Sequence, residues 1–368
     1  MKYIKQLDSL RAIAVLLVII SHWLPKSHLL NSIPLGVIGV DIFFVLSGFL
    51  ITSILFSNKN KEEVSNGKII KFFYARRVLR IFPIYYLCLF VLLALEEYTN
   101  TNIKEDFIYY FTYTTNFNFI IKNDWDGMIS HFWSLAVEEQ FYLFWPWIIV
   151  FTRRKYLFHI ISIFIVIGLS SRLIFSEFEW GRILTTSCFD SLGIGAMLAW
   201  FVTYKNQSVR SFYIFIRALS ILVLINYLLF LIIPDTGYWI DIPEGTTNSI
   251  VAAWVISFIY LNKESKSFIF RFLWNNNILI YIGRISYGIY LYHKILPTFS
   301  WIIRRKLQSF IPEIKWFFEL PHTVFITNFI ILIFISSASY RFIESPILRY
   351  KRYFKLNRGN SKTLYETN

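Results

Sequence analysis

Apolar runs long enough to cross a lipid bilayer recur along the whole chain, separated by short polar or charged connections. Each run is close to the roughly 20 residues that a spanning α-helix needs, with some allowance for tilt. The pattern predicts an all-α polytopic membrane protein with about ten transmembrane helices. The expected spans are residues 10–27, 35–56, 81–95, 132–151, 156–176, 185–203, 212–233, 246–262, 278–303 and 322–343.

These runs predict a single transmembrane domain over residues 1–350, followed by a basic, polar tail over residues 351–368. The composition agrees with a membrane protein, because only 16% of the residues are charged, against about 25% in soluble domains. One aromatic stretch, residues 107–121, is an exception. It contains Asn116 and Asn118, which a lipid-facing helix would avoid, so we expect an interfacial or re-entrant segment there.

Basic residues gather in the loops on one side of the predicted spans. The net charge is +14, and the positive-inside rule places these basic loops in the cytoplasm. We therefore expect both termini to be cytoplasmic, with the cluster at residues 304–306 as an exception on the other side. This distribution explains the charge by topology in a lipid membrane and gives no reason to expect a nucleic-acid partner. The basic segments are residues 59–80, 153–155, 205–210, 263–271 and 349–358, and the acidic loops are residues 96–106, 176–180 and 234–244.

Arg11 and His22 lie in one of the most apolar runs of the chain. Eleven residues of α-helix fall within about 20° of three full turns and rise roughly 16 Å, so both side chains are expected on one face. An ionisable residue inside a membrane helix is costly and usually marks a functional site. The alternative for His22 is a plain hydrogen bond between helices.

Three arginines, Arg76, Arg77 and Arg80, lie at the cytoplasmic start of the third predicted span. Their spacings of three and four residues bring them onto adjoining helical turns. Guanidinium groups pair bidentately with phosphate oxygens, so this cluster is a candidate phosphate clamp on the same membrane side as Arg11. The alternative is that the arginines only anchor the helix in its orientation.

Glu138 belongs to a polar face of the fourth predicted span that it shares with His131 and Ser134, at spacings of three and four residues. We expect Glu138 to be a partner of His22 at similar depth, or else a structural partner of Arg172. Supporting candidates near the outer side are Asp41, His131 and His293, and helix packing is an equally good explanation for Asp41.

Six segments resemble, in order and spacing, the signature segments of the membrane-bound acyltransferase-3 family. They cover roughly residues 5–350 and are LDSLRAIAVLLVIISH, GVIGVDIFFVLSGFLIT, FYARRVLRIFPIYY, HFWSLAVEEQFYLFWP, SYGIYLYH and FIESP. The family's pattern of an arginine, ten residues and a histidine falls on Arg11 and His22. Its Arg-x-x-Arg motif falls on Arg77 and Arg80, and its glutamate after Trp-Ser-Leu falls on Glu138.

The resemblance implies a ten-helix O-acyltransferase of the polysaccharide or O-antigen type in the bacterial inner membrane. Such an enzyme moves an acyl group, usually acetyl, from cytoplasmic acetyl-CoA to a hydroxyl of a cell-surface glycan, an exopolysaccharide or its lipid-linked precursor. Two departures from relatives stand out. Cys188 occupies a position where many carry an arginine, and the extracytoplasmic hydrolase-like domain of some relatives is missing. We therefore expect the membrane domain to complete the transfer.

A mechanism follows from these positions. The arginines are expected to hold the phosphates of acetyl-CoA while its pantetheine arm reaches His22, the general base, which Glu138 orients. No Cys/His spacing typical of zinc is evident, so we expect no metal. Two other classes stay open, a secondary transporter with an intramembrane relay and a protein that binds lipid-linked oligosaccharides. Outer aromatic residues could stack on sugars or form an interfacial belt, namely Trp125, Tyr238, Trp239, Trp316 and Phe317.

Overall fold

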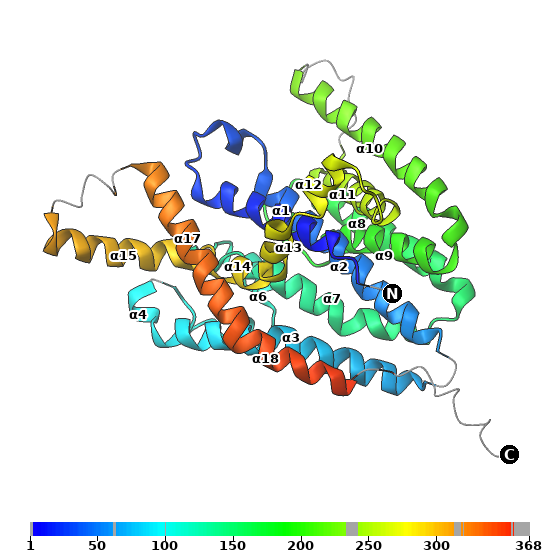
Figure 1. Ribbon diagram of the computed structural model, residues 1–368, viewed down its shortest axis with the longest axis horizontal. Helices are drawn as coiled ribbons and strands as arrows, with labels where there is room; N and C mark the ends of the chain where they lie inside the picture. Colours follow the sequence, from blue (N-terminus) through cyan, green and yellow to red (C-terminus); the bar gives the residue numbers. More distant parts are fainter. Residues whose placement is uncertain are drawn as a thin grey trace.

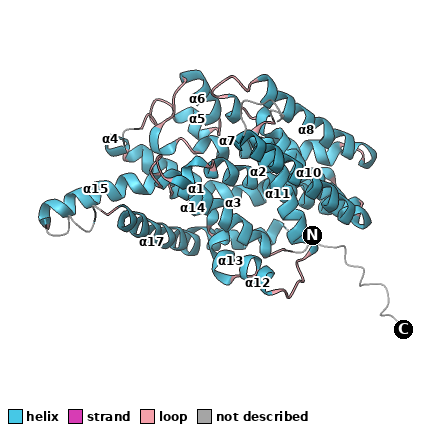
Figure 2. Cartoon of the chain, turned by 90° about the horizontal axis from the view of Figure 1, so that it is seen from above, coloured by secondary structure: helices cyan, strands magenta, loops and turns pink. Residues whose placement is uncertain are grey.

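The computed structural model describes residues 3–61, 64–99, 101–232, 242–312, 318, 320–354 and 356. Over these residues the protein is built from helices joined by loops, with no strand (Figures 1 and 2). The predicted sugar-stacking residues 238, 239, 316 and 317 and most of the tail lie outside the described residues. Trp125 is described, and its ring packs against Trp180 with centroids 4.7 Å apart.

Seven of the described helical segments are long and apolar enough to cross a membrane, so the chain is a polytopic membrane protein. The predicted count of ten spans and the cytoplasmic position of both termini stay predictions. The main helices are α1 Gln6–Trp23, α2 Leu35–Lys59, α3 Asn66–Ala94, α7 Phe132–Phe151, α8 Leu157–Ile174, α9 Phe189–Tyr204, α10 Val209–Ile232, α11 Glu244–Leu261 and α17 Pro321–Ser339.

Helix α7 has the length of a span but is not among those seven. Its polar triplet, residues 138–140, lowers its mean hydropathy. Helix α11 is also long enough, but its first turns carry the polar sequence EGTTNS. Both helices nevertheless coincide with predicted runs to within two residues, so the apolar pattern located them correctly.

The prediction of one continuous span over residues 278–303 is wrong. This stretch consists of α13 Asn277–Arg284, α14 Ser286–Tyr292 and α15 Ile295–Phe310. Helix α13 packs on α1 so closely that a Cβ on Gly283 would lie 1.8 Å from the carbonyl oxygen of Asp8. The chain therefore meets α1 backbone to backbone just before α13 ends, a tertiary constraint that the apolar composition does not reveal.

Residues 107–121 do not form a spanning helix, which confirms that part of the prediction. They form α5 Phe107–Phe111 and most of α6 Thr115–Lys122, both too short to cross a bilayer. Asn116 is fully buried and donates hydrogen bonds to the carbonyl oxygen of Ile183 and to Thr185 Oγ1, at 3.2 and 3.0 Å. The polar side chains of this segment thus face protein.

Helix α2 packs closely against both α1 and α9. A Cβ on Gly39 would lie 2.5 Å from the carbonyl oxygen of Ala14 in α1, and one on Gly48 would lie 1.9 Å from that of Leu192 in α9. Only glycine allows backbones to approach so closely. The three helices therefore form the scaffold that positions the polar side chains of α1 and α2.

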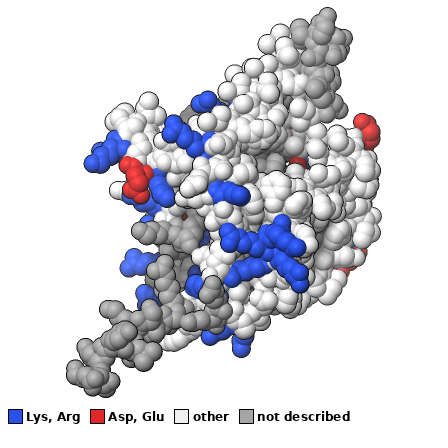
Figure 3. Space-filling model, turned by 90° about the vertical axis from the view of Figure 1, so that its right-hand side faces the viewer, with Lys and Arg blue, Asp and Glu red and all other residues white. Residues whose placement is uncertain are grey.

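Figure 3 shows the end of the molecule on which the N-terminus lies, at the right of Figure 1. Lys and Arg side chains form several patches on this face, and fewer acidic side chains are visible on it. This is the end that the charge pattern of the loops assigns to the cytoplasm.

Candidate active site

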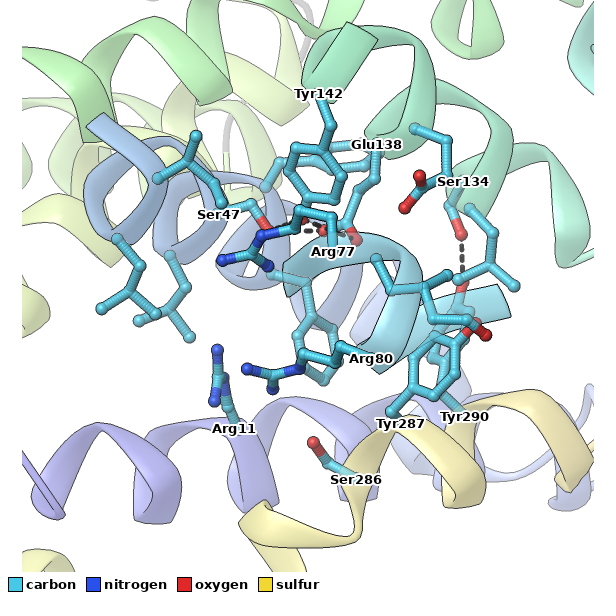
Figure 4. Close-up of a pocket in the computed structure, with 18 of the residues that line it drawn as sticks. Arg11, Ser47, Arg77, Arg80, Ser134, Glu138, Tyr142, Ser286, Tyr287 and Tyr290 are labelled. Carbon is cyan, nitrogen blue, oxygen red and sulfur yellow. Dashed lines mark hydrogen bonds between the residues drawn. The ribbon is translucent and has the colours of Figure 1, made fainter. Parts of the chain in front are cut away.

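A cavity of about 400 Å³ lies between α1, α2, α3, α7 and α14 and brings together most of the predicted site residues (Figure 4). The lining includes Arg11 from α1, all three arginines of α3 and Glu138 from α7. These residues are separated by up to 127 positions in the sequence, so their convergence is a result of the fold. His22 is not among the lining residues.

The arginines gather at one end of the cavity. Arg11 forms an ion pair with Asp8, with Nη1 3.3 Å from Oδ1. Arg77 lies over the rings of Phe73 and Tyr142, at 5.7 and 5.3 Å from the ring centroids. The three arginines of α3 are partly buried and form no ion pair with any described residue. This end therefore holds positive charge that the protein does not neutralise at close range.

Helix α3 begins at Asn66, fifteen residues before the predicted start of this span. The arginines consequently lie well inside a continuous helix and not at its mouth. The helix therefore holds Arg76, Arg77 and Arg80 at fixed angles to one another, and all three line the cavity.

Glu138 is not the partner of His22, which corrects the sequence prediction. Its Oε1 accepts a hydrogen bond from Ser47 Oγ at 2.7 Å, and its Oε2 accepts a longer one from the Tyr142 hydroxyl at 3.3 Å. The predicted alternative is also wrong, since Arg172 pairs with other carboxylates. Matching the ends of two helices estimates depth, but it does not give the rotation that turns Glu138 toward α2.

His22 instead forms a hydrogen bond with His293, whose Nε2 lies 3.0 Å from His22 Nδ1. His293 is completely buried, and its Nδ1 lies 2.6 Å from the carbonyl oxygen of Tyr290. A carbonyl can only accept, so Nδ1 of His293 is the donor. In the neutral form of His293, Nε2 is then the acceptor, and His22 donates from Nδ1. In that arrangement Nε2 of His22 carries the lone pair.

A third histidine completes this cluster. His131 is buried, its ring centroid lies 4.8 Å from that of His293, and its Nε2 lies 3.1 Å from the carbonyl oxygen of Leu291. The predicted supporting residues His131 and His293 therefore lie together, and His293 contacts His22 directly. The His22 side chain itself is exposed at the end of α1.

Ser134 and Tyr290 connect the cavity to the histidines. Both line the cavity, and their hydroxyl groups share a hydrogen bond (Figure 4). The Tyr290 ring also lies against His293 and His131, with centroids 5.4 and 5.7 Å apart. The side chain of Tyr290 thus lines the cavity and also contacts His293, the partner of His22.

Asp41 belongs to a separate polar cluster. Its carboxylate lies 3.7 Å from Arg172 Nη2 and accepts a hydrogen bond from Asn248 Nδ2 at 3.0 Å. Arg172 forms a shorter ion pair, 2.9 Å, with the fully buried Asp190. Asp41 does not line the cavity, so its placement agrees with the packing alternative. Cys188 is buried near this cluster.

Three residues of the site were not singled out from the sequence, namely Ser47, Tyr142 and Tyr290. Tyr142 lies one helical turn after Glu138, a spacing that could have identified it. Tyr290 lies within the SYGIYLYH segment, but nothing in the spacing shows that it faces a cavity. No group of three or more His, Cys, Asp or Glu side chains suited to a metal occurs among the described residues.

The chain matches the family described as "Acyltransferase domain" over residues 4–341. It therefore belongs to this acyltransferase-3 family, as the six segments indicated, and so to a class of enzymes that transfer acyl groups.

Relatives in Staphylococcus aureus carry related names. A protein of strain COL named "Putative O-acetyltransferase" is 34% identical over 373 residues, which cover 94% of this chain and 57% of the relative. O-acetyltransferase OatA of strain NCTC 8325 is 29% identical over 377 residues, with the same coverage. The chain thus spans 57% of the length of these curated relatives. No solved protein structure is a match.

Proposed function

We propose that this chain is an O-acyltransferase that moves an acetyl group from cytoplasmic acetyl-CoA to a hydroxyl of a cell-surface glycan or its lipid-linked precursor in the inner membrane. One observation carries the proposal. A single cavity has unpaired arginines at one end, and its other end lies one side chain away from a hydrogen-bonded histidine pair. The names of the relatives support the O-acetyl part of the proposal.

The arginine end is suited to the polyanionic part of CoA. Guanidinium groups form charge-assisted, bidentate hydrogen bonds with phosphates, and Arg76, Arg77 and Arg80 have no carboxylate partner that a phosphate would have to displace. The pantetheine arm would then follow the largely apolar wall toward Ser134 and Tyr290. The rise from Arg11 to His22 along α1, roughly 16 Å, suits the length of such an arm.

The histidine end is suited to activating a hydroxyl group. Nε2 of His22 takes the proton of the acceptor hydroxyl as its oxygen attacks the thioester carbonyl. The carbon–sulfur bond then breaks, and the proton passes from His22 to the departing CoA sulfur. His293 holds the tautomer of His22 that this step needs, the role that we had expected of Glu138. The side chains of Ser134 and Tyr290 must move aside for the thioester to reach His22.

The exposed position of His22 supports an acceptor that arrives from the outer side. The donor reaches the same residue from the cavity, so donor and acceptor would meet without sharing one route. Glu138, bonded to Ser47 and Tyr142, is proposed to shape the cavity wall near the arginines.

The proposal is tested with purified protein in lipid nanodiscs, supplied with radiolabelled acetyl-CoA and a cell-envelope glycan extract. We expect label on glycan hydroxyls, removable by mild base, and none with the His22→Ala variant. The matched control is His159→Ala, since His159 is an exposed histidine of α8 that does not line the cavity. Label transfer that survives in His22→Ala would contradict the base assignment, and absence of transfer by the wild type would contradict the function.

A further inference from the structure

A second cavity adjoins the arginine cavity at the same end of the molecule. It measures about 840 Å³, and Tyr3 and Ile4 line both cavities, so the two are neighbours across the start of α1. Its other walls come from the ends of α2, α9 and α11 and from residues between 263 and 284. The proposed mechanism assigns no role to this cavity.

The lining of this second cavity is basic and aromatic. It includes Lys5, Lys263 and Arg284, against one acidic residue, Glu264. Lys5 and Lys263 form no ion pair with any described residue. Lys263 Nζ lies 4.6 Å from the ring centroid of Tyr260, which also lines the cavity. The unpaired ammonium group of Lys263 thus lies beside an aromatic face.

A buried hydroxyl group in this wall also lacks a partner. Ser53 is only 2% exposed and lines the cavity, and its Oγ forms no hydrogen bond in the described structure. Buried polar groups in folded proteins are almost always hydrogen-bonded, and leaving one unsatisfied costs free energy. An unpaired buried hydroxyl facing a cavity of ligand size indicates that a polar ligand completes the bond.

Resting on the function proposed above, we propose that the second cavity binds the nucleotide end of acyl-CoA, the adenosine 3′,5′-bisphosphate group. Lys263 and Lys5 face the 3′-phosphate, and Tyr260 offers a stacking surface for the adenine ring. Gln6 lines the second cavity and Arg11 lines the first. They are five residues apart on α1, a rise of about 8 Å. One CoA molecule can therefore place its 3′-phosphate in the second cavity and its pyrophosphate among the arginines.

The 3′-phosphate gives the sharpest test, because it is a single group that can be removed from the donor. Initial rates are measured with acetyl-CoA and with 3′-dephospho-acetyl-CoA as donors, for the wild type and for Lys263→Gln. In the wild type we expect removal of the 3′-phosphate to raise KM about tenfold, as for one charge-assisted contact. In Lys263→Gln this preference should fall to about twofold.

The dephospho donor also serves as the folding control, since a misfolded variant would lose activity with both donors. Lys266→Gln is the matched control, because Lys266 is three residues away and does not line the cavity. It should keep the full preference. A wild type that does not distinguish the donors, or a Lys263→Gln variant that still does, would overturn the proposal.

A binding measurement separates this proposal from the proposed function. Adenosine 3′,5′-bisphosphate carries no acyl group, so its binding by isothermal titration calorimetry does not depend on transfer. We expect binding by the wild type and by Lys266→Gln, and binding about tenfold weaker in Lys263→Gln. Equal affinity in all three proteins would overturn the assignment. Specific binding without any acetyl transfer would place the failure in the proposed function alone.

Discussion

The two ends of the proposed reaction path are built differently. At the arginine end, Arg76, Arg77 and Arg80 have no ionic partner among the described residues. At the histidine end, a chain of hydrogen bonds runs from the Tyr290 carbonyl through His293 to His22. One end is left incomplete, as a binding site for an anion should be, and the other is preorganised within the protein, as a base should be. Binding and chemistry should therefore be separable by mutation.

The largest expected effect is at His22. His22→Ala should reduce acetyl transfer by about 1,000-fold or more, within the range typical of general-base catalysis, while leaving expression and membrane insertion unchanged. The measurement is base-labile acetyl on surface glycans by mass spectrometry in cells that lack the native gene and carry each variant. His159→Ala should behave as the wild type. A variant within tenfold of normal activity would show that His22 is not the base.

His293 tests whether the histidine end is preorganised. His293→Ala should lower kcat by about 100-fold, because His22 loses the partner that holds its tautomer and orientation. His293→Gln offers an amide oxygen that can accept from His22 Nδ1, so it should recover part of the loss. The readout is kcat in nanodiscs, together with ¹⁵N NMR of labelled histidine, which distinguishes the two imidazole tautomers.

The NMR signal makes the role of His293 specific. A merely structural role would lower activity without changing the tautomer of His22. If His22 shows the same tautomer in the wild type and in His293→Ala, or if the Gln variant recovers nothing, the hydrogen-bonded pair does not position the base.

The arginine end should respond in the opposite way. Arg77→Ala and Arg80→Ala should each raise KM for acetyl-CoA about ten- to a hundredfold with little change in kcat, because each removes a phosphate contact distant from the thioester. Lys at either position should rescue only in part, since it keeps the charge and loses the planar fork. Arg153→Ala removes an exposed arginine outside the cavity and is the matched control. An unchanged KM in both alanine variants would leave these residues as topology anchors.

Glu138 should matter moderately and more than its neighbour. Glu138→Gln should lower kcat/KM by about tenfold, because it weakens the hydrogen bonds from Ser47 and Tyr142 that order the wall beside the arginines. Glu139 also lines the cavity, but no hydrogen bond to a described residue holds it, so Glu139→Gln should cost less. Steady-state kinetics on both variants decide the order. Equal losses would show that the carboxylate charge near the arginines matters and the bonding pattern does not.

The smallest expected effect concerns the scaffold that both ends share. Gly48→Ala should destabilise the fold by about 1–3 kcal/mol, because a Cβ there would press on the backbone of α9. Thermal unfolding in detergent should show a lower midpoint for Gly48→Ala. Gly67→Ala should leave the unfolding midpoint unchanged, since nothing lies within 4 Å of a Cβ at Gly67. No change at Gly48 would mean that α2 and α9 can separate without cost.

Much of the helical framework could be predicted because apolar length is a local property. Residues 132–151 match α7, and the runs for α8, α9 and α11 end within two residues of the observed helices. The prediction of one span over residues 278–303 failed, and the stretch packs against the backbone of α1 at Gly283, just before its first break. Apolar composition is the same on both sides of such a break.

The candidate site also has one part that the sequence predicted and one part that it did not. Helical spacing predicted that Arg77 and Arg80 act together, and the arginine cavity contains both. The partner of His22 could not be predicted from spacing, since it depends on which faces of α1, α7 and α14 meet. Matching helix ends suggested Glu138, but His293, 271 positions away in the sequence, forms the bond.

The separation of binding from chemistry is tested most directly by measuring acetyl-CoA affinity and kcat on the same purified variants. We expect the two variants to show opposite defects. His22→Ala should bind acetyl-CoA with wild-type affinity and transfer nothing, whereas the Arg77→Ala/Arg80→Ala double variant should bind it at least tenfold more weakly and keep near-normal kcat at saturation. A His22→Ala variant that loses affinity, or an arginine double variant that loses kcat with unchanged affinity, would contradict the assignment of donor binding to one end and proton transfer to the other.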